Sequence, residues 1–287
     1  MFEKLSNSWD LVKASAHILA ADKELLVFPL ISAFGTLLVS AVFLLPMIVA
    51  KSFDALIIKN MDVFGYLVLF AFYVVQYFVI FFCNTALVGA AMIRINGGDP
   101  TVRDGFQIAF SRFSPILGYA LIAATVGMIL QILSDRSKGI SRFVVSLLGL
   151  AWNLATFLVV PVLAVENVGP IEAVKRSVFL LKRTWGEQIA GNLGLGAFFG
   201  LVTFFVFLAF VPVIVLLAIQ TENIVLVAVV AGVLAMVLIA ISLIKGALSG
   251  IYTAAVYQFT ETGKAGNFFT KDQVLNAFRP VTNPSLN

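Results

Sequence analysis

Six long runs of apolar residues, separated by short polar segments, dominate this chain of 287 residues. Each run reaches the roughly 20 residues that an α-helix needs to cross about 30 Å of hydrocarbon. The pattern therefore predicts an all-α integral membrane protein with six transmembrane helices. The predicted spans are Leu25–Ala50, Val63–Ile93, Phe113–Leu133, Phe143–Val165, Gln188–Ile219 and Ile224–Phe259.

The connections between the spans are short, and they predict how the helices pair. Only Gln220–Asn223 joins the fifth span to the sixth, and so short a connection allows only a tight turn between antiparallel helices. No connection is long enough to hold a soluble domain. We therefore expect residues 1–287 to form a single transmembrane domain built from three helical hairpins.

Ahead of the first, third and fifth spans the chain is amphipathic, as expected of helices that lie in the headgroup plane. The first such segment is Ser8–Leu19. In the second, Asp99 is predicted to cap a helix that Pro100 opens. The third is Pro170–Trp185, and Pro170 suits its first position. Its predicted apolar face consists of Ile171, Val174, Val178, Leu181 and Trp185.

The recurrence of an amphipathic helix followed by a hairpin predicts an internal repeat. A short match supports it, because Asn84–Gly89 near the end of the second span resembles Lys245–Gly250 late in the sixth. The predicted units are residues 1–98, 99–168 and 169–263, followed by a C-terminal tail, residues 264–287.

Composition agrees with a membrane protein, because 61% of the residues are hydrophobic and 12% are charged. Lys and Arg number 13 in the terminal segments and loops on one predicted side and 5 on the other. Because basic residues are retained in the cytoplasm, both termini are predicted to be cytoplasmic. The net charge of +4 is spread over these short segments, so no nucleic-acid partner is expected.

Catalytic and metal-binding constellations are missing from the sequence. His17 and Cys83 are the only histidine and cysteine, so no zinc site is expected. The spans hold no Asp, Glu or His at mid-depth, where intramembrane hydrolysis would need one. We therefore expect neither an enzyme nor a bound cofactor.

Three segments in the second half of the chain carry a resemblance to known proteins: Val159–Glu166, Gly169–Ser177 and Lys182–Trp185. They resemble the central signature of an uncharacterised family of prokaryotic six-helix membrane proteins. The chain is more distantly similar to the membrane domain of some glycerophosphodiester phosphodiesterases, but it has no phosphodiesterase domain. The resemblance implies a fold and a prokaryotic cytoplasmic (inner) membrane, and it implies no activity.

The leading functional hypothesis is a scaffold protein that binds membrane lipids or a membrane protein partner. It rests on a basic helix face beside an aromatic side chain, which suits anionic headgroups at about 1 kcal/mol per basic residue. The residues are Lys175, Arg176, Lys182, Arg183 and Trp185. The sequence predicts no oligomeric state.

The alternative is a transporter or channel for an uncharged or lipidic solute, with a cavity lined by polar residues of the spans. The candidates are Asn84, Lys245, Tyr252, Asn153 and Asn192. Each has an ordinary structural explanation as well. Lys245 lies about 31 Å along its helix from Ile224, where a lysine can snorkel to the headgroups. An intramembrane amide commonly bonds a neighbouring helix.

Overall fold

The computed structural model describes residues 13, 15–49, 63–183, 187–221 and 223–262, and within these ranges it contains helices and no strand. Residues 15–21 are helical. The elements that follow are η1 (Lys23–Leu26), α2 (Val27–Val49), α3 (Val63–Ile95), α4 (Val102–Ser111), α5 (Phe113–Arg136), α6 (Ile140–Ala155), α7 (Val159–Val165), α8 (Pro170–Arg183), α9 (Glu187–Gln220) and α10 (Ile224–Thr262).

The prediction of an all-helical chain with six membrane-length helices is confirmed. Helices α2, α3, α5, α9 and α10 are each long and apolar enough to cross a membrane, and α6 and α7 together supply the remaining one. Three of the helices, α3, α9 and α10, are much longer than the roughly 20 residues that cross a membrane. With 39 residues, α10 extends for about 58 Å.

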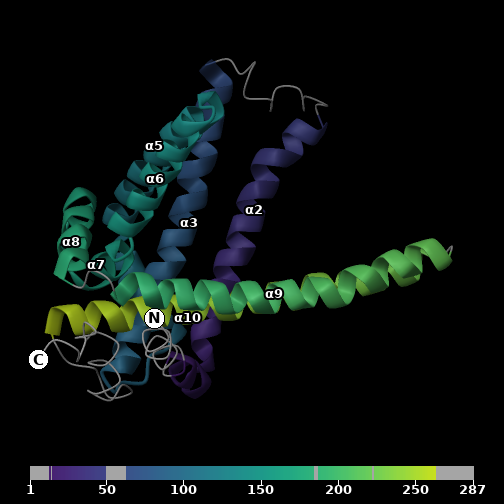
Figure 1. The fold of residues 1–287 in the computed structure, drawn as a ribbon. Helices are drawn as coiled ribbons and strands as arrows, with labels where there is room; N and C mark the ends of the chain where they lie inside the picture. The colour runs from purple at the N-terminus through teal and green to yellow at the C-terminus, as the bar shows by residue number, and fades with distance from the viewer. Residues whose placement is uncertain (1–12, 14, 50–62, 184–186, 222, 263–287) are drawn as a thin grey trace, which may run out of the picture.

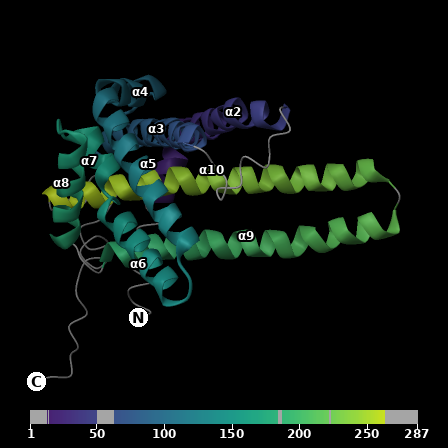
Figure 2. The same ribbon diagram turned by 90° about the horizontal axis from the view of Figure 1, so that it is seen from above.

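Consecutive long helices pack against each other, α2 on α3, α5 on α6 and α9 on α10. Figure 1 shows the first two pairs rising together, while α9 and α10 leave in a different direction. Figure 2 shows α9 and α10 side by side, with the halves next to their connecting turn extending away from the other helices. We call residues 201–220 and 224–244 the arm. The arm's described residues include no charged side chain.

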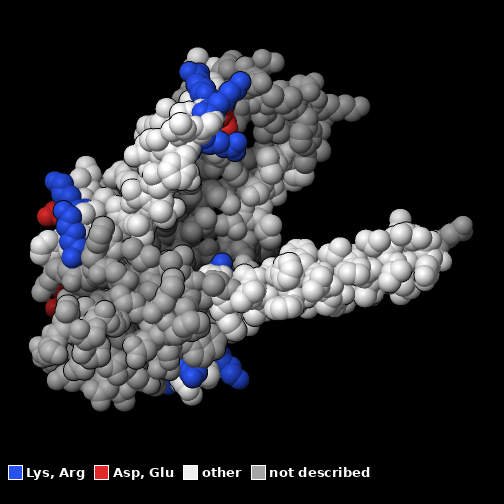
Figure 3. Space-filling model, in the orientation of Figure 1, with Lys and Arg blue, Asp and Glu red and all other residues white. Residues whose placement is uncertain are grey.

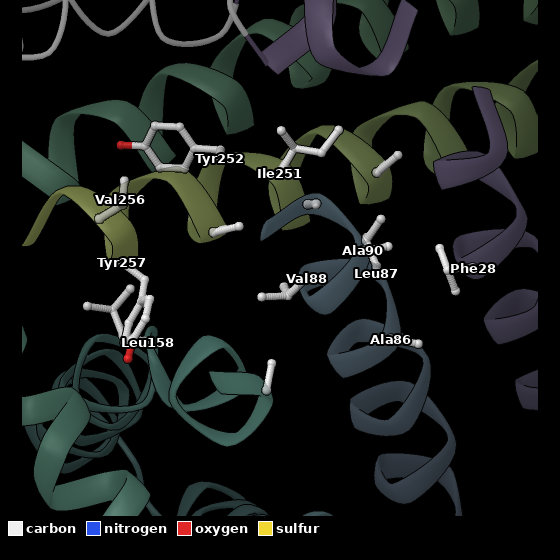
Figure 4. Close-up of a cluster of buried hydrophobic side chains, with 14 of the residues drawn as sticks. Phe28, Ala86, Leu87, Val88, Ala90, Leu158, Ile251, Tyr252, Val256 and Tyr257 are labelled. Atoms are coloured by element: carbon white, nitrogen blue, oxygen red, sulfur yellow. The ribbon is translucent and has the colours of Figure 1, made fainter. Parts of the chain in front are cut away.

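All three pairs meet in a compact region that we call the base, formed by the C-terminal ends of α3 and α10 with α4, α7 and α8. Most of the large, fully buried side chains lie there. Figure 4 shows Leu87 of α3, Ile251 of α10 and Leu158 at the start of α7 in this cluster. A β-carbon added to Gly250 would lie 2.4 Å from Leu87 Cδ2, so α3 and α10 approach closely.

Small residues hold the amphipathic helices α4 and α8 against the other helices of the base. The fully buried positions of α4 are Gly105 and Ala109, one turn apart. A β-carbon on Gly105 would lie 2.7 Å from the Ala86 carbonyl oxygen of α3. In α8 the corresponding pair is Ala173 and Ser177, both 0% exposed. This spacing lets helix backbones approach closely.

Some large apolar side chains of these helices point outward as a consequence. Ile171 in α8 and Phe110 in α4 are each 63% exposed, although the sequence pattern grouped Ile171 with the half-buried Val174 and the buried Leu181. The pattern located an apolar side on each helix, but the side in contact with the protein is centred on the small residues.

The predicted start of the second amphipathic helix is wrong. Thr101 caps α4, since the Asp104 amide donates to Thr101 Oγ1 at 3.2 Å and the Thr101 amide donates to Asp104 Oδ2 at 2.9 Å. Asp99 instead pairs with Arg94 at 3.0 Å. A reciprocal capping box satisfies two backbone donors at once, so it prevails over a single cap from Asp99. Pro170, in contrast, begins α8 as predicted.

The second and third amphipathic helices each pack on the second span of the preceding pair, α4 on α3 and α8 on α7. The short helix η1, which follows the first amphipathic segment, contacts α10. Three repeated units arranged in a ring would produce this pattern, although the repeat itself stays a prediction. Half of Ser8–Leu19 and the whole tail, residues 264–287, lie outside the described residues.

The fourth span is broken inside the apolar run, where α6 ends at Ala155 and α7 begins at Val159. Pro161 cannot donate the backbone hydrogen bond that would continue the helix. Ser177 of α8 bridges the break: its hydroxyl accepts from the Leu158 amide at 3.1 Å and donates to the Ala155 carbonyl at 2.7 Å. One buried side chain thereby satisfies two backbone groups that the break leaves unpaired.

Replacing Ser177 with alanine is expected to lower the free energy of unfolding by about 1–3 kcal/mol, because two buried backbone groups lose their partner. Ser242→Ala, the same change at an exposed position of the arm, is the control and should stay within about 0.5 kcal/mol of wild type. Detergent-mediated unfolding followed by circular dichroism measures both. Equal stability of the two variants would show that the bridge does not stabilise the fold.

Candidate functional site

A cavity of about 710 Å³ lies between α3, α5 and α6. Its volume falls in the range of roughly 300–1,000 Å³ that is usual for small-molecule sites. The residues that line it are Tyr77 and Phe81 of α3, Tyr119, Ala123, Gly127, Leu130, Gln131 and Ser134 of α5, and Arg142, Val145, Ser146, Gly149, Trp152, Asn153, Thr156 and Val160 of the fourth span.

Helical periodicity explains how these residues come to share one space. The lining positions of α5 and α6 recur every three or four residues, so each helix turns one continuous stripe toward the other. Small residues at the middle of the stripes leave the hollow. Nothing lies closer than 4.0 Å to a β-carbon built on Gly149, and one built on Gly127 would lie 3.3 Å from the Tyr77 hydroxyl.

The cavity changes character along its length. Its inner end, near the base, holds the buried Tyr119 together with Phe81 and Val160. Its outer end, near the turn between α5 and α6, holds Ser134 and Arg142. From Tyr119 to Ser134 the cavity follows α5 for 15 residues, about 22 Å. Asn153 and Thr156 add polar groups to the mainly aromatic and aliphatic inner end, while the charged Arg142 lies at the outer end. An elongated space of this kind suits an amphipathic ligand.

A second, smaller cavity of about 490 Å³ lies in the base beside Gly89, Ile108 and Val165. Its lining is apolar except at Asn96. The side-chain oxygen Oδ1 of Asn96 already accepts from Gln258 Nε2 at 2.7 Å, and its side-chain nitrogen Nδ2 donates to the Met92 backbone carbonyl at 2.8 Å. With its polar group occupied, this cavity is the weaker candidate.

A polar cluster joins α7, α8 and α10 at the surface of the base. Arg176 contacts Glu166 Oε1 at 3.1 Å and both carboxylate oxygens of Glu261 at 2.8 Å. The Tyr257 hydroxyl donates to Glu166 Oε1 at 2.9 Å. The hydrogen bond from Arg176 to Glu166 raises the pKa of the guanidinium above its usual value. Arg176 therefore joins α8 to α10 and to the end of α7 through ion pairs within the protein.

Of the other residues of the predicted headgroup face, two are exposed and two have side chains outside what the structure describes. Lys175 and Lys182 are exposed on α8, where headgroups could reach them. Arg183 belongs to α8, but its side chain lies outside what the structure describes, as does all of Trp185. Arg176 pairs with the two carboxylates of the cluster, and its role at the headgroup face stays a prediction.

Of the predicted cavity residues, Asn153 alone lines the α3–α5–α6 cavity. Tyr252 is 2% exposed and packed in the base core, and Asn84 is half-buried. Lys245 is exposed, just before the buried part of α10 begins. Neither cavity described above includes these three, since α3 and α10 pack too closely there. The Asn192 side chain lies outside the described residues.

Four cavity residues, Tyr119, Ser134, Arg142 and Ser146, were not identified from the sequence. Arg142 was counted only as a loop charge. A helical-wheel comparison of the third and fourth spans could have found them, because the polar and small residues of each span fall on one stripe. Among the residues that the structure describes, no group of three or more His, Cys, Asp or Glu side chains could hold a metal ion.

The fold and the cavity together define a class: an all-helical protein with six helices that can cross a membrane, and an elongated amphipathic cavity between three of them. The chain belongs to the family of unknown function DUF6159, whose model matches residues 63–268. The matched region contains the whole cavity. No curated protein and no solved structure matches the chain. The distant resemblance to phosphodiesterase membrane domains stays a prediction.

Reversing the ion pair tests the polar cluster. Arg176→Glu should destabilise the protein by roughly 1–3 kcal/mol, because Glu166 and Glu261 lose their charged donor. Adding Glu261→Arg should restore part of the loss. Lys175→Glu, one residue away on the exposed face of α8, is the control and should leave unfolding unchanged. Destabilisation that the second substitution fails to relieve would contradict direct pairing.

Proposed function

We propose that this protein is a multi-pass protein of a prokaryotic cytoplasmic membrane that binds an amphipathic, lipid-like molecule in the α3–α5–α6 cavity. The observation that carries the proposal is the lining of the cavity, which is mainly aromatic and aliphatic at the inner end and carries the charged Arg142 at the outer end. Our proposed role is binding, without catalysis.

The energetics of polar groups in lipid support an occupied cavity. Gln131 and Ser146, in the outer part of the cavity, are exposed although they lie in membrane-length helices. An unsatisfied polar group in hydrocarbon is costly, so each needs a partner. A lipid with a polar headgroup and an apolar chain would supply hydrogen bonds along the outer part of the cavity and apolar contacts along the inner part.

The proposed placement has three hairpins entering the membrane from a cytoplasmic base, with α4 and α8 in the headgroup plane. The outward-facing Phe110 and Ile171 support it, because they would lie against acyl chains. The excess of basic residues among the segments on the base side supports cytoplasmic termini. Lys175 and Lys182 remain available for anionic headgroups or a membrane protein partner.

Filling the cavity tests the proposal. Native mass spectrometry of protein released from phosphatidylcholine nanodiscs should detect one tightly retained lipid per wild-type chain. Gly149→Leu should lose it, because the new side chain projects into the hollow beside Leu130. Gly232→Leu, a helical glycine of the arm with open space around it, is the matched control and should retain the lipid.

Either of two results would refute lipid binding in this cavity. One is a wild-type chain that retains no lipid in stoichiometric amount. The other is a Gly149→Leu variant that folds normally and retains as much lipid as Gly232→Leu does.

A second candidate function is movement of lipid between leaflets. It is favoured by the length of the cavity, since about 22 Å exceeds the roughly 15 Å of one leaflet. In proteoliposomes containing nitrobenzoxadiazole-labelled lipid, a scramblase would let dithionite quench nearly all of the label, and Gly149→Leu would return quenching to the outer half. Half-quenching by wild-type protein would exclude this function.

A further inference from the structure

We propose that Arg142 makes the cavity selective for amphiphiles with an anionic headgroup, such as a phosphate or carboxylate on an acyl chain. This inference rests on the proposed function and adds the chemical class of the ligand.

The outer end of the cavity combines one cation with several neutral hydrogen-bonding groups. Arg142 and Ser146 lie one turn apart on α6, and Gln131 and Ser134 lie at the facing end of α5. A guanidinium presents five donors and no acceptor, and it binds phosphate or carboxylate in a bidentate manner. The hydroxyls and the amide add donors that adjust to a headgroup oxygen.

The Arg142 guanidinium is available for such a ligand. No hydrogen bond or ion pair joins it to any other residue that the structure describes. This distinguishes it from Arg176, which is held by Glu166 and Glu261, and from Arg112, which donates to Asn167.

The surroundings of Arg142 are also positive. The turn from Asp135 to Arg142 carries Arg136, Lys138 and Arg142 against one carboxylate, Asp135. Figure 3 shows blue side chains gathered at this end of the α5–α6 pair, in contrast to the uncharged arm. A positive potential at the mouth of a cavity concentrates anions there.

This positive turn lies on the side of the membrane where basic residues are depleted. In the proposed orientation the α5–α6 turn is non-cytoplasmic, and placing three basic residues there works against the retention of positive charge in the cytoplasm. A basic residue at a helix end can simply snorkel to the membrane surface, which accounts for Arg136 and Lys138. Arg142 differs from them because it lines the cavity.

Lipid competition tests the inference. The protein is released from nanodiscs that contain equal amounts of phosphatidylglycerol and phosphatidylcholine with identical acyl chains, and native mass spectrometry identifies the retained lipid. Wild-type protein should favour phosphatidylglycerol by about fivefold, which corresponds to the roughly 1 kcal/mol expected per basic residue. Arg142→Gln should bring the preference close to one while still retaining a lipid.

Arg136→Gln is the matched control, because it removes a charge from the same turn without changing the cavity lining. It should keep most of the preference. A second experiment adds oleate or oleyl alcohol to phosphatidylcholine nanodiscs. Displacement by oleate but not by the alcohol would identify a single-chain acid, whereas a preference confined to phosphatidylglycerol would identify a membrane phospholipid. Both outcomes support an anionic amphiphile.

Three outcomes would overturn the selectivity: no preference in wild-type protein, a preference unchanged in Arg142→Gln, or equal losses in Arg142→Gln and Arg136→Gln. Each leaves lipid binding itself standing if a lipid is still retained. A wild-type chain that retains no lipid would refute the proposed function as well, so the two failures are distinguishable.

Discussion

The rest of the structure depends on how the break in the fourth span is satisfied. Inside a membrane every backbone amide and carbonyl needs a partner, and a helix interrupted at Thr156–Leu158 leaves several without one. Ser177 reaches from α8 to bond both sides of the break. This contact fixes α8 against the base and turns α7 into the core. The residues just before the break, Asn153 and Thr156, line the inner part of the cavity. The amphipathic helix α8 and the element that lines the cavity are thus joined through one hydroxyl.

Close packing of small residues explains the shape of the base. Gly105, Ala173 and Gly250 let helices approach until a side chain of one helix touches the backbone or core of the next. Along the arm, α9 and α10 pack on each other, and most of the described residues there are exposed. Buried apolar packing is therefore concentrated in the base.

Much of this fold could be predicted from the sequence, because length and apolarity are enough to identify a membrane helix. The six spans and the start of α8 at Pro170 follow from such local rules. The cap of α4 was missed, since Thr101 and Asp104 outcompete Asp99 only through a reciprocal pair of bonds. Asn153 was found because an amide stands out in an apolar run. Arg142 was missed because a charge near a turn is ordinary, and only packing shows that it faces a cavity. The internal pairing of Arg176 joins residues 85 positions apart, which no local pattern reveals.

The most direct test of an amphiphile in the α3–α5–α6 cavity is an electron cryo-microscopy map of the protein in lipid nanodiscs. The account predicts elongated density along α5, with its head beside Arg142 and its tail near Tyr119. The contradicting result is a cavity filled by protein, either the arm folded against α5 and α6 or a helix of another chain.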